Sequence, residues 1–323
     1  MRYMLLKLAA LCCCAVVLLT SCAKGDSSDS QQNSSRTDPA SSTAEESSQP
    51  QKTPPVVFNT IQGDTEPYST VSAVYCVESK TYNFGKNLES RISIASTTKL
   101  LTASVALKYM KPDAILTAGS ELGLINPQST TCYVYYGCEM SLSDLLGGLL
   151  IPSGNDAAYV IAVNVARAQQ PGKQLSDKEA VDHFCKLMND FAQELGMTDS
   201  HFVNPDGWDD PQHYSTAADM VKLAEYALTV PEICETMKTA YKTVSFSAGG
   251  YATWTNNNYF VIPGSNYYSP DALGMKTGTT ENAGYCLITA FKRNSKTYIC
   301  LAMGCNTDYD RFDLTQKLLE SYT

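Results

Sequence analysis

Stretches typical of β-strands lie near both ends of the long region that follows residue 55, and helical patterns fill the middle. Residues 69–78 alternate in polarity and precede a Ser-Lys turn and a second run at 81–84, which predicts a hairpin. Residues 283–292 and 297–303 are rich in β-forming side chains and flank a polar turn, which predicts another hairpin. We therefore expect one domain of the α/β (α+β) class, in which a mixed or antiparallel sheet lies beside an inserted helical lobe.

The first 22 residues have the build of a secretory signal. Arg2 and Lys7 precede an apolar run at 8–19, which is too short to span a bilayer comfortably. Residues 19–22 read Leu-Thr-Ser-Cys and resemble the lipobox of bacterial lipoproteins. That resemblance implies cleavage before Cys22, lipid attachment to it and a location at the extracytoplasmic face of the bacterial membrane. The alternative is an ordinary signal peptide with an incidental cysteine.

Residues 23–55 contain no apolar side chain larger than alanine. Such a segment cannot bury enough apolar surface to offset the entropy of ordering, so we predict a disordered polar tether. Its mean reach is about 30 Å, and its stretched reach is about 110 Å. The expected catalytic domain then spans residues 56–323.

The composition excludes several classes of protein. The chain has 323 residues, 44% of them hydrophobic, which is enough for a full-sized core. Its formal net charge is -9 and no basic stretch is present, so nucleic acid is not expected as a partner. No histidine lies in a His-Glu-x-x-His arrangement, so we expect no metal or other cofactor and interpret His183, His201 and His213 as structural.

Capping and breaking residues outline the helical lobe, and the sequence predicts helix starts at Ser141, Ser176 and Thr216. The expected elements are helices at 95–110, 142–151, 157–168, 176–195 and 216–228, with a short strand in a loop at 133–136. Pro152 ends the second of these helices, and Asp156 is expected to cap the third.

Ser96 and Lys99 lie three residues apart at the start of the first expected helix. Residues at this spacing share a helix face, so the hydroxyl and the amine can touch. A serine nucleophile needs a base, and a lysine serves as one only when uncharged. Since the ordinary pKa of lysine is about 10.4, burial or a second cation must lower it by about 3. On its own, the pair is also typical of a capped helix with a surface lysine.

Two further motifs follow Ser96-x-x-Lys99. Ser153-Gly154-Asn155 lies on a tight connection between two apolar helices, and Lys276-Thr277-Gly278 lies on an expected strand edge. This order of motifs is that of penicillin-binding proteins and class A β-lactamases.

Acyl transfer assigns a role to each motif residue. Ser96 attacks and Lys99 takes its proton. Ser153 relays the proton to the leaving amine, while Asn155 holds Lys99 or the substrate amide. Lys276 supplies a second positive charge, which lowers the pKa of Lys99 and attracts an anionic substrate.

Oxyanion donors and a ligand for a carboxylate complete the expected site. The backbone N–H groups of Ser96 and Thr279 are the expected oxyanion donors. Arg311, at the start of a last helix that runs to Tyr322, is either a solvent-exposed arginine or a ligand for a substrate carboxylate.

From Thr70 to Tyr322 the chain resembles the serine-type D-alanyl-D-alanine carboxypeptidases, which are low-molecular-mass penicillin-binding proteins of β-lactamase/transpeptidase-like fold. Beyond the three motifs, the likeness includes residues 188–189, 195–197, 204–207, 215–216, 256–258 and 283–285. The resemblance implies a peptidoglycan stem peptide ending in D-Ala-D-Ala as the substrate, an acyl-enzyme on Ser96, and acylation by β-lactam antibiotics. It also implies that Arg311 and Thr277 hold the terminal carboxylate. Some members of the family carry histidine where this chain has Thr279.

Two other functions compete with this interpretation. A class A β-lactamase needs a Glu-x-x-x-Asn loop for fast deacylation, and no such loop lies between the second and third motifs. An inactive wall-binding lipoprotein would have no need to keep every chemical group of the site.

Eight of the 12 cysteines fall in the expected domain. Export permits disulfides, although Cys185 and Cys286 are interpreted as core residues. Cys132 and Cys138 flank a short loop, and the sequence leaves open whether they form a disulfide.

Overall fold

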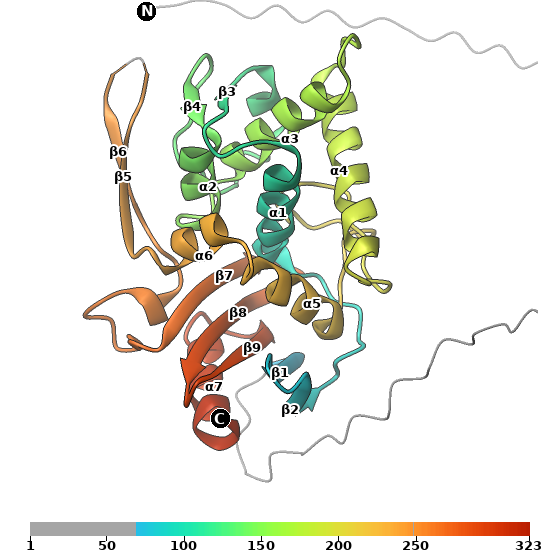
Figure 1. Ribbon diagram of the computed structural model, residues 1–323. Coiled ribbons are helices and arrows are strands. Elements are labelled where there is room, and N and C mark those ends of the chain that lie inside the picture. The colour runs from blue at the N-terminus through green and yellow to red at the C-terminus, as the bar shows by residue number, and fades with distance from the viewer. Residues whose placement is uncertain (1–68, 248) are drawn as a thin grey trace, which may run out of the picture. The chain divides into compact units, whose positions relative to one another are not determined.

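One five-stranded antiparallel sheet joins both ends of the described chain (Figure 1). The computed structural model describes residues 69–247 and 249–323. The strand order is β2-β1-β9-β8-β7, and every neighbouring pair is antiparallel. These strands are β1 (Val71–Cys76), β2 (Thr81–Lys86), β7 (Ala272–Thr280), β8 (Gly284–Arg293) and β9 (Lys296–Cys305). The fold class and both predicted hairpins are therefore confirmed, and β7 is an edge strand.

The expected signal peptide at 1–22, the tether at 23–55 and the first part of the expected domain, 56–68, lie outside the described residues. All residues that the structure describes belong to one compact unit. Among them, no helix has both the length and the apolar character needed to cross a bilayer.

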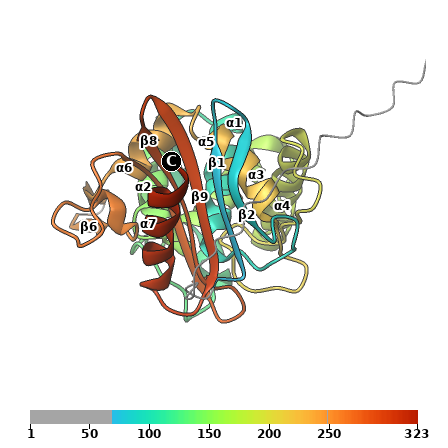
Figure 2. The same cartoon turned by 90° about the horizontal axis from the view of Figure 1, so that it is seen from below.

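Both faces of the sheet are covered, which explains why β9 is apolar almost throughout. Successive residues of a strand point to opposite faces. Ile299 and Leu301 pack in the core shared with the helical lobe, whereas Cys300 packs on the other face against Phe312. Phe312 belongs to α7 (Asp310–Tyr322), which lies across that second face (Figure 2). Each fully buried leucine or isoleucine stabilises the fold by about 1.5–3 kcal/mol.

The remaining elements form the lobe between β2 and β7. Its helices are α1 (Lys99–Tyr109), α2 (Leu142–Leu150), α3 (Asn155–Gln169), α4 (Asp177–Glu194), α5 (Ala217–Ala227) and α6 (Pro231–Lys238). Two small antiparallel pairs join them, β3 (Ile115–Thr117) with β4 (Glu139–Ser141), and β5 (Tyr241–Ser245) with β6 (Tyr251–Thr255). The eight residues from Lys99 to Ala106 are all buried, so α1 is the central helix of the lobe.

Side-chain caps fix the starts of three helices. The Ser141 hydroxyl accepts from the Asp144 N–H at α2, and Ser176 forms a full capping box with Glu179 at α4. Thr216 accepts from the Asp219 N–H at α5. Each such cap is worth about 1 kcal/mol, and all three were readable from the sequence.

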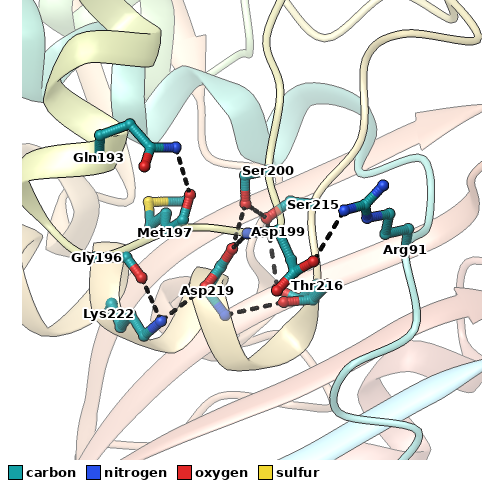
Figure 3. Close-up of polar contacts among 10 residues, drawn as sticks. All are labelled: Arg91, Gln193, Gly196, Met197, Asp199, Ser200, Ser215, Thr216, Asp219 and Lys222. Atoms are coloured by element: carbon teal, nitrogen blue, oxygen red, sulfur yellow. Dashed lines mark hydrogen bonds and ion pairs between the residues drawn. The ribbon is translucent and has the colours of Figure 1, made fainter. Parts of the chain in front are cut away.

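The buried Asp219 carboxylate ties the two ends of the loop between α4 and α5 together (Figure 3). One of its oxygens accepts from the Asp199 N–H and the Ser200 hydroxyl, both at 2.8 Å. The other accepts from Lys222 Nζ at 2.8 Å. The Ser200 and Ser215 hydroxyls are 2.7 Å apart and close the loop. The loop is therefore held at both ends before it crosses the nucleophile turn described below.

The structure differs from the expectations at four places. α3 begins at Asn155 with Gly154 as its N-cap, so Asp156 is not the cap; its carboxylate instead accepts from the Cys132 and Val134 N–H groups at 2.9 Å. These backbone bonds hold 133–136 as a loop, and no strand forms there. The pair β3 and β4 was not predicted because strands of three residues are too short to show periodicity. The eight-residue helix α6 was also missed.

All eight cysteines among the described residues are free thiols, and seven of them are buried. Cys132 does not pair with Cys138, because its thiol donates to Asp156 Oδ1 at 3.2 Å.

We expect all eight of these cysteines to react with iodoacetamide when the protein is unfolded without reductant, because none is held in a disulfide. Peptide mass mapping measures this directly. A peptide carrying Cys132 linked to Cys138, with the mass reduced by two hydrogens, would contradict the structure.

Candidate active site

The nucleophile turn, Ala95–Thr98, is a short 3-10 helix that leads directly into α1. It places Ser96 one turn before Lys99, and Lys99 Nζ lies 2.7 Å from Ser96 Oγ. The contact predicted from the Ser-x-x-Lys spacing is therefore present. Lys99 is fully buried, so the amine belongs to the interior and not to the surface of the helix.

Two further oxygens fix the Lys99 amine. Nζ donates to Asn155 Oδ1 at 2.7 Å and to the main-chain carbonyl of Asp206 at 2.8 Å. A neutral amine has two hydrogens and one lone pair. With both hydrogens given to Asn155 and Asp206, the lone pair points at the Ser96 hydroxyl. In this arrangement Lys99 can act as a general base that takes the proton of the nucleophile Ser96.

Burial lowers the pKa of Lys99 to about 8, while the nearby Asp206 and Asp156 carboxylates oppose that change. Of the two causes that the sequence allowed, burial is the leading one. Burial also lowers the pKa of Lys276 well below its ordinary value, with the charges of Lys99 and Arg311 adding to the effect. At neutral pH a useful fraction of Lys99 is therefore uncharged and able to accept a proton.

Asp206 and Ser129 orient Asn155, and neither was singled out from the sequence. Asn155 Nδ2 donates to Asp206 Oδ2 at 2.6 Å and to Ser129 Oγ at 2.8 Å. Because both acceptors hold the NH2 end of the amide, its oxygen faces Lys99. The sequence marked Asp206 only as part of an Asn-Pro-Asp-Gly turn, and it offered no signal for Ser129.

The loop that carries Asp206 also packs against the nucleophile turn. Gly207 has φ of 85°, and a Cβ there would lie 1.9 Å from the Ala95 carbonyl oxygen. His213 Nδ1 accepts from the Val203 N–H, so its Nε2 carries the proton and donates to Thr98 Oγ1 at 2.8 Å. The buried His213 is thus structural, as predicted, and it supports the turn that presents Ser96.

Strand β7 approaches the nucleophile turn from another side. A Cβ at Gly278 would lie 2.8 Å from the Ser96 nitrogen, so only glycine lets the strand come this close. Lys276 is buried, and its Nζ donates to the Thr277 carbonyl at 2.9 Å. Thr279 follows at an exposed position. The first and third motifs therefore meet across a backbone contact, although Lys276 makes no hydrogen bond to Ser96 or Lys99 in the part of the chain that the structure describes.

Ser153 and Arg311 are placed less directly. Ser153 is buried in the connection between α2 and α3 with φ of 71°, and its hydroxyl makes no hydrogen bond to another described residue. Arg311 is 5% exposed, so it is not a solvent-exposed arginine. Its guanidinium reaches the end of β7, where Nη1 donates to the Gly278 carbonyl at 3.1 Å and to Thr279 Oγ1 at 3.3 Å.

An open hollow of about 620 Å³ lies beside the site. Asp206 forms part of its wall together with Trp208, Asp209 and Asp210. Ser96, Lys99 and Asn155 are not among the residues that line it.

We expect acylation of Ser96 to rise about tenfold per pH unit from pH 6 and to level off near pH 8, because only neutral Lys99 accepts the proton and its pKa is about 8. The rate of labelling by a fluorescent penicillin from pH 6 to 9 measures this. Lys99→Arg, which cannot lose its proton, should be inactive throughout. A rate that does not change over this range would exclude Lys99 as the base.

Gly207→Ala should lower the acylation rate at least about 100-fold, because its Cβ would displace the Ala95 carbonyl and with it the nucleophile. Gly264→Ala is the matched control: Gly264 has a nearly equal φ of 88°, and no atom lies within 4 Å of its Cβ position. The control should lose about 1–2 kcal/mol of stability from backbone strain and keep its acylation rate. Equal rates in the two variants, measured beside denaturant unfolding, would refute the packing role of Gly207.

Comparisons with known proteins identify the family of this chain. A family model for D-alanyl-D-alanine carboxypeptidases, Peptidase S11, matches residues 82–307. D-alanyl-D-alanine carboxypeptidase DacC of Escherichia coli (strain K12) is 30% identical over 246 residues, which make up 72% of this chain and 56% of that protein. The carboxypeptidase of Streptomyces sp. (strain K15) is 33% identical over 228 residues, 67% of this chain and 74% of that protein. The chain thus spans little more than half the length of the E. coli relative.

Solved structures show the same likeness. The Streptomyces K15 DD-transpeptidase matches with a TM-score of 0.71 and 28% identity, covering 80% of this chain and 98% of that chain. Penicillin-binding protein D2 of Listeria monocytogenes, solved in its ampicillin-bound form, matches with a TM-score of 0.65 and 27% identity over 80% of this chain and 98% of that chain. The chain therefore belongs to the Peptidase S11 family of D-alanyl-D-alanine carboxypeptidases.

Proposed function

We propose that this protein is a serine-type D-alanyl-D-alanine carboxypeptidase that removes the terminal D-alanine from peptidoglycan stem peptides. The observation that carries the proposal is the buried Lys99 amine, which lies 2.7 Å from Ser96 Oγ and is held there by Asn155 and the Asp206 carbonyl. Membership of the Peptidase S11 family supports the substrate class.

In the acylation step, Ser96 Oγ attacks the carbonyl carbon of the penultimate D-alanine, and its proton passes to Lys99. The backbone N–H groups of Ser96 and Thr279 stabilise the oxyanion. When the intermediate collapses, the C–N bond breaks and the leaving amine takes a proton from Lys99 by way of Ser153. The products are free D-alanine and an ester on Ser96. Water then attacks the ester, again with Lys99 as the base, and restores the serine.

Strand β7 and Arg311 recognise the end of the substrate. As an edge strand, β7 leaves part of its backbone free to pair with an extended peptide. Lys276 offers an N–H donor to the substrate, while Thr277, Thr279 and Arg311 hold the terminal carboxylate. The nearness of Arg311 to Thr279 supports this assignment.

β-Lactam antibiotics are the second class of ligand. A β-lactam presents a strained amide and a carboxylate to the same groups and leaves a slowly hydrolysed ester on Ser96. The ampicillin-bound form of the Listeria relative supports this part of the proposal.

The N-terminal segment gives the enzyme its place in the cell. We propose that Cys22 carries a lipid that anchors the chain to the extracytoplasmic face of the membrane, and that residues 23–55 act as a tether. With a stretched reach of about 110 Å, the tether lets the enzyme act on polymer just outside the membrane.

The purified protein should release D-alanine from a model pentapeptide ending in D-Ala-D-Ala and should be labelled by fluorescent penicillin with slow turnover. Both activities should vanish in Ser96→Ala, because no other group can form the ester. Ser104→Ala is the control, since Ser104 is a buried serine of α1 whose hydroxyl, among the residues that the structure describes, bonds only to the Leu100 carbonyl.

Two outcomes would contradict the proposal. Labelling that survives in Ser96→Ala removes Ser96 from the chemistry. Rapid hydrolysis of penicillin without release of D-alanine would identify a β-lactamase instead.

A further inference from the structure

One nitrogen of the Arg311 guanidinium forms hydrogen bonds with the sheet. Nη1 donates to the Gly278 carbonyl at 3.1 Å, to the Cys286 carbonyl at 3.0 Å and to Thr279 Oγ1 at 3.3 Å. The side chain is only 6% exposed. These contacts fix the position of the guanidinium between β7 and β8, so it cannot swing out to meet a ligand.

On the other edge of the guanidinium, one of the two N–H groups has a partner and the other has none among the described residues. Nη2 forms an ion pair with Asp308 Oδ1. The buried Nε has no hydrogen-bond partner among the described residues. Nε and Nη2 point the same way from a guanidinium and form the fork that binds both oxygens of a carboxylate. Asp308 therefore binds Nη2, which is one of the two N–H groups that could hold a carboxylate, and leaves the other, Nε, without a partner.

Asp308 can leave this position at lower cost than Arg311 can. Its side chain is 30% exposed, and its other oxygen accepts from the Tyr259 hydroxyl at 3.2 Å. A displaced Asp308 carboxylate would keep contact with both water and Tyr259. A buried guanidinium with no counter-charge, in contrast, is strongly destabilising. An anion beside Arg311 is therefore favoured, and Asp308 is its only ion-pair partner in 69–247 and 249–323.

We propose that Asp308 is a specificity-determining residue that takes the place of the substrate's terminal carboxylate on Arg311 in the free enzyme. The arriving carboxylate displaces Asp308 and binds both Nη2 and the unpartnered Nε. The inference rests on the proposed function and deepens it: Asp308 raises the KM for peptides that end in a free carboxylate and has no effect on peptides whose terminus is an amide.

The test compares one D-Ala-D-Ala peptide as its free acid and as its C-terminal carboxamide, with release of D-alanine or D-alaninamide measured by mass spectrometry. Asp308→Asn should lower the KM for the acid about fivefold, which corresponds to roughly 1 kcal/mol, and leave kcat unchanged. The ratio of kcat/KM for the acid to that for the amide should rise by the same factor. Asp308→Ser removes the same charge and should give the same result.

Asp310→Asn is the matched control. It removes an equal charge from the first turn of α7, where Asp310 accepts from the Thr307 N–H and does not pair with Arg311. Its KM for the acid should equal that of the wild type. Thermal unfolding and penicillin labelling verify that each variant is folded.

An unchanged or higher KM for the acid in both Asp308 variants would overturn the inference. An equal change of KM for the acid and the amide would also overturn it, because it would mean that Asp308 only positions Arg311. If the wild-type protein releases no D-alanine at all, the proposed function itself has failed and the inference falls with it.

Discussion

A lysine amine buried among uncharged oxygens is the constraint on which the rest of this site depends. The three hydrogen-bond partners of Lys99 are a hydroxyl, a side-chain amide and a peptide carbonyl, and none carries a formal charge. Burial penalises the charged form, so the amine becomes a usable base near neutral pH. The Asp206 carboxylate binds the far end of the Asn155 amide. In that place it orients Asn155 without forming the direct ion pair that would keep Lys99 protonated.

Separate parts of the fold create this environment. The nucleophile turn carries Ser96 and leads into α1, which begins with Lys99. α3 begins with Asn155, and the loop between α4 and α5 supplies the Asp206 carbonyl. Edge strand β7 closes the remaining side through Gly278. Backbone approaches the nucleophile turn closely at Gly207 and Gly278, where a Cβ would meet atoms of Ala95 and Ser96, which is why glycine stands at both points.

The sequence predicted the parts of this structure that follow from local pattern. The two hairpins, three of the helix caps and the contact between Ser96 and Lys99 all depend on spacing along the chain. The role of the Asp206 carbonyl could not be predicted, because every residue has such a group and only the fold decides where it points. The same holds for Ser129 and for the pairing of Arg311 with Asp308. Asp156 was mistaken for a cap because its position just before an apolar run fits that role, yet its carboxylate is used by the loop at 132–134.

The loop between α4 and α5 carries a consequence for how the protein loses reactivity. It gives Lys99 one of its acceptors and shields the amine from water, and it is held by hydrogen bonds at both ends and by Thr102 and Asn155 in its middle. If the loop detaches while the helices stay intact, water reaches the amine, and the affinity of Lys99 for its proton returns toward that of a free lysine. The serine then has no base although the helices remain, so chemical competence reports on the completed tertiary assembly in a way that helix content does not.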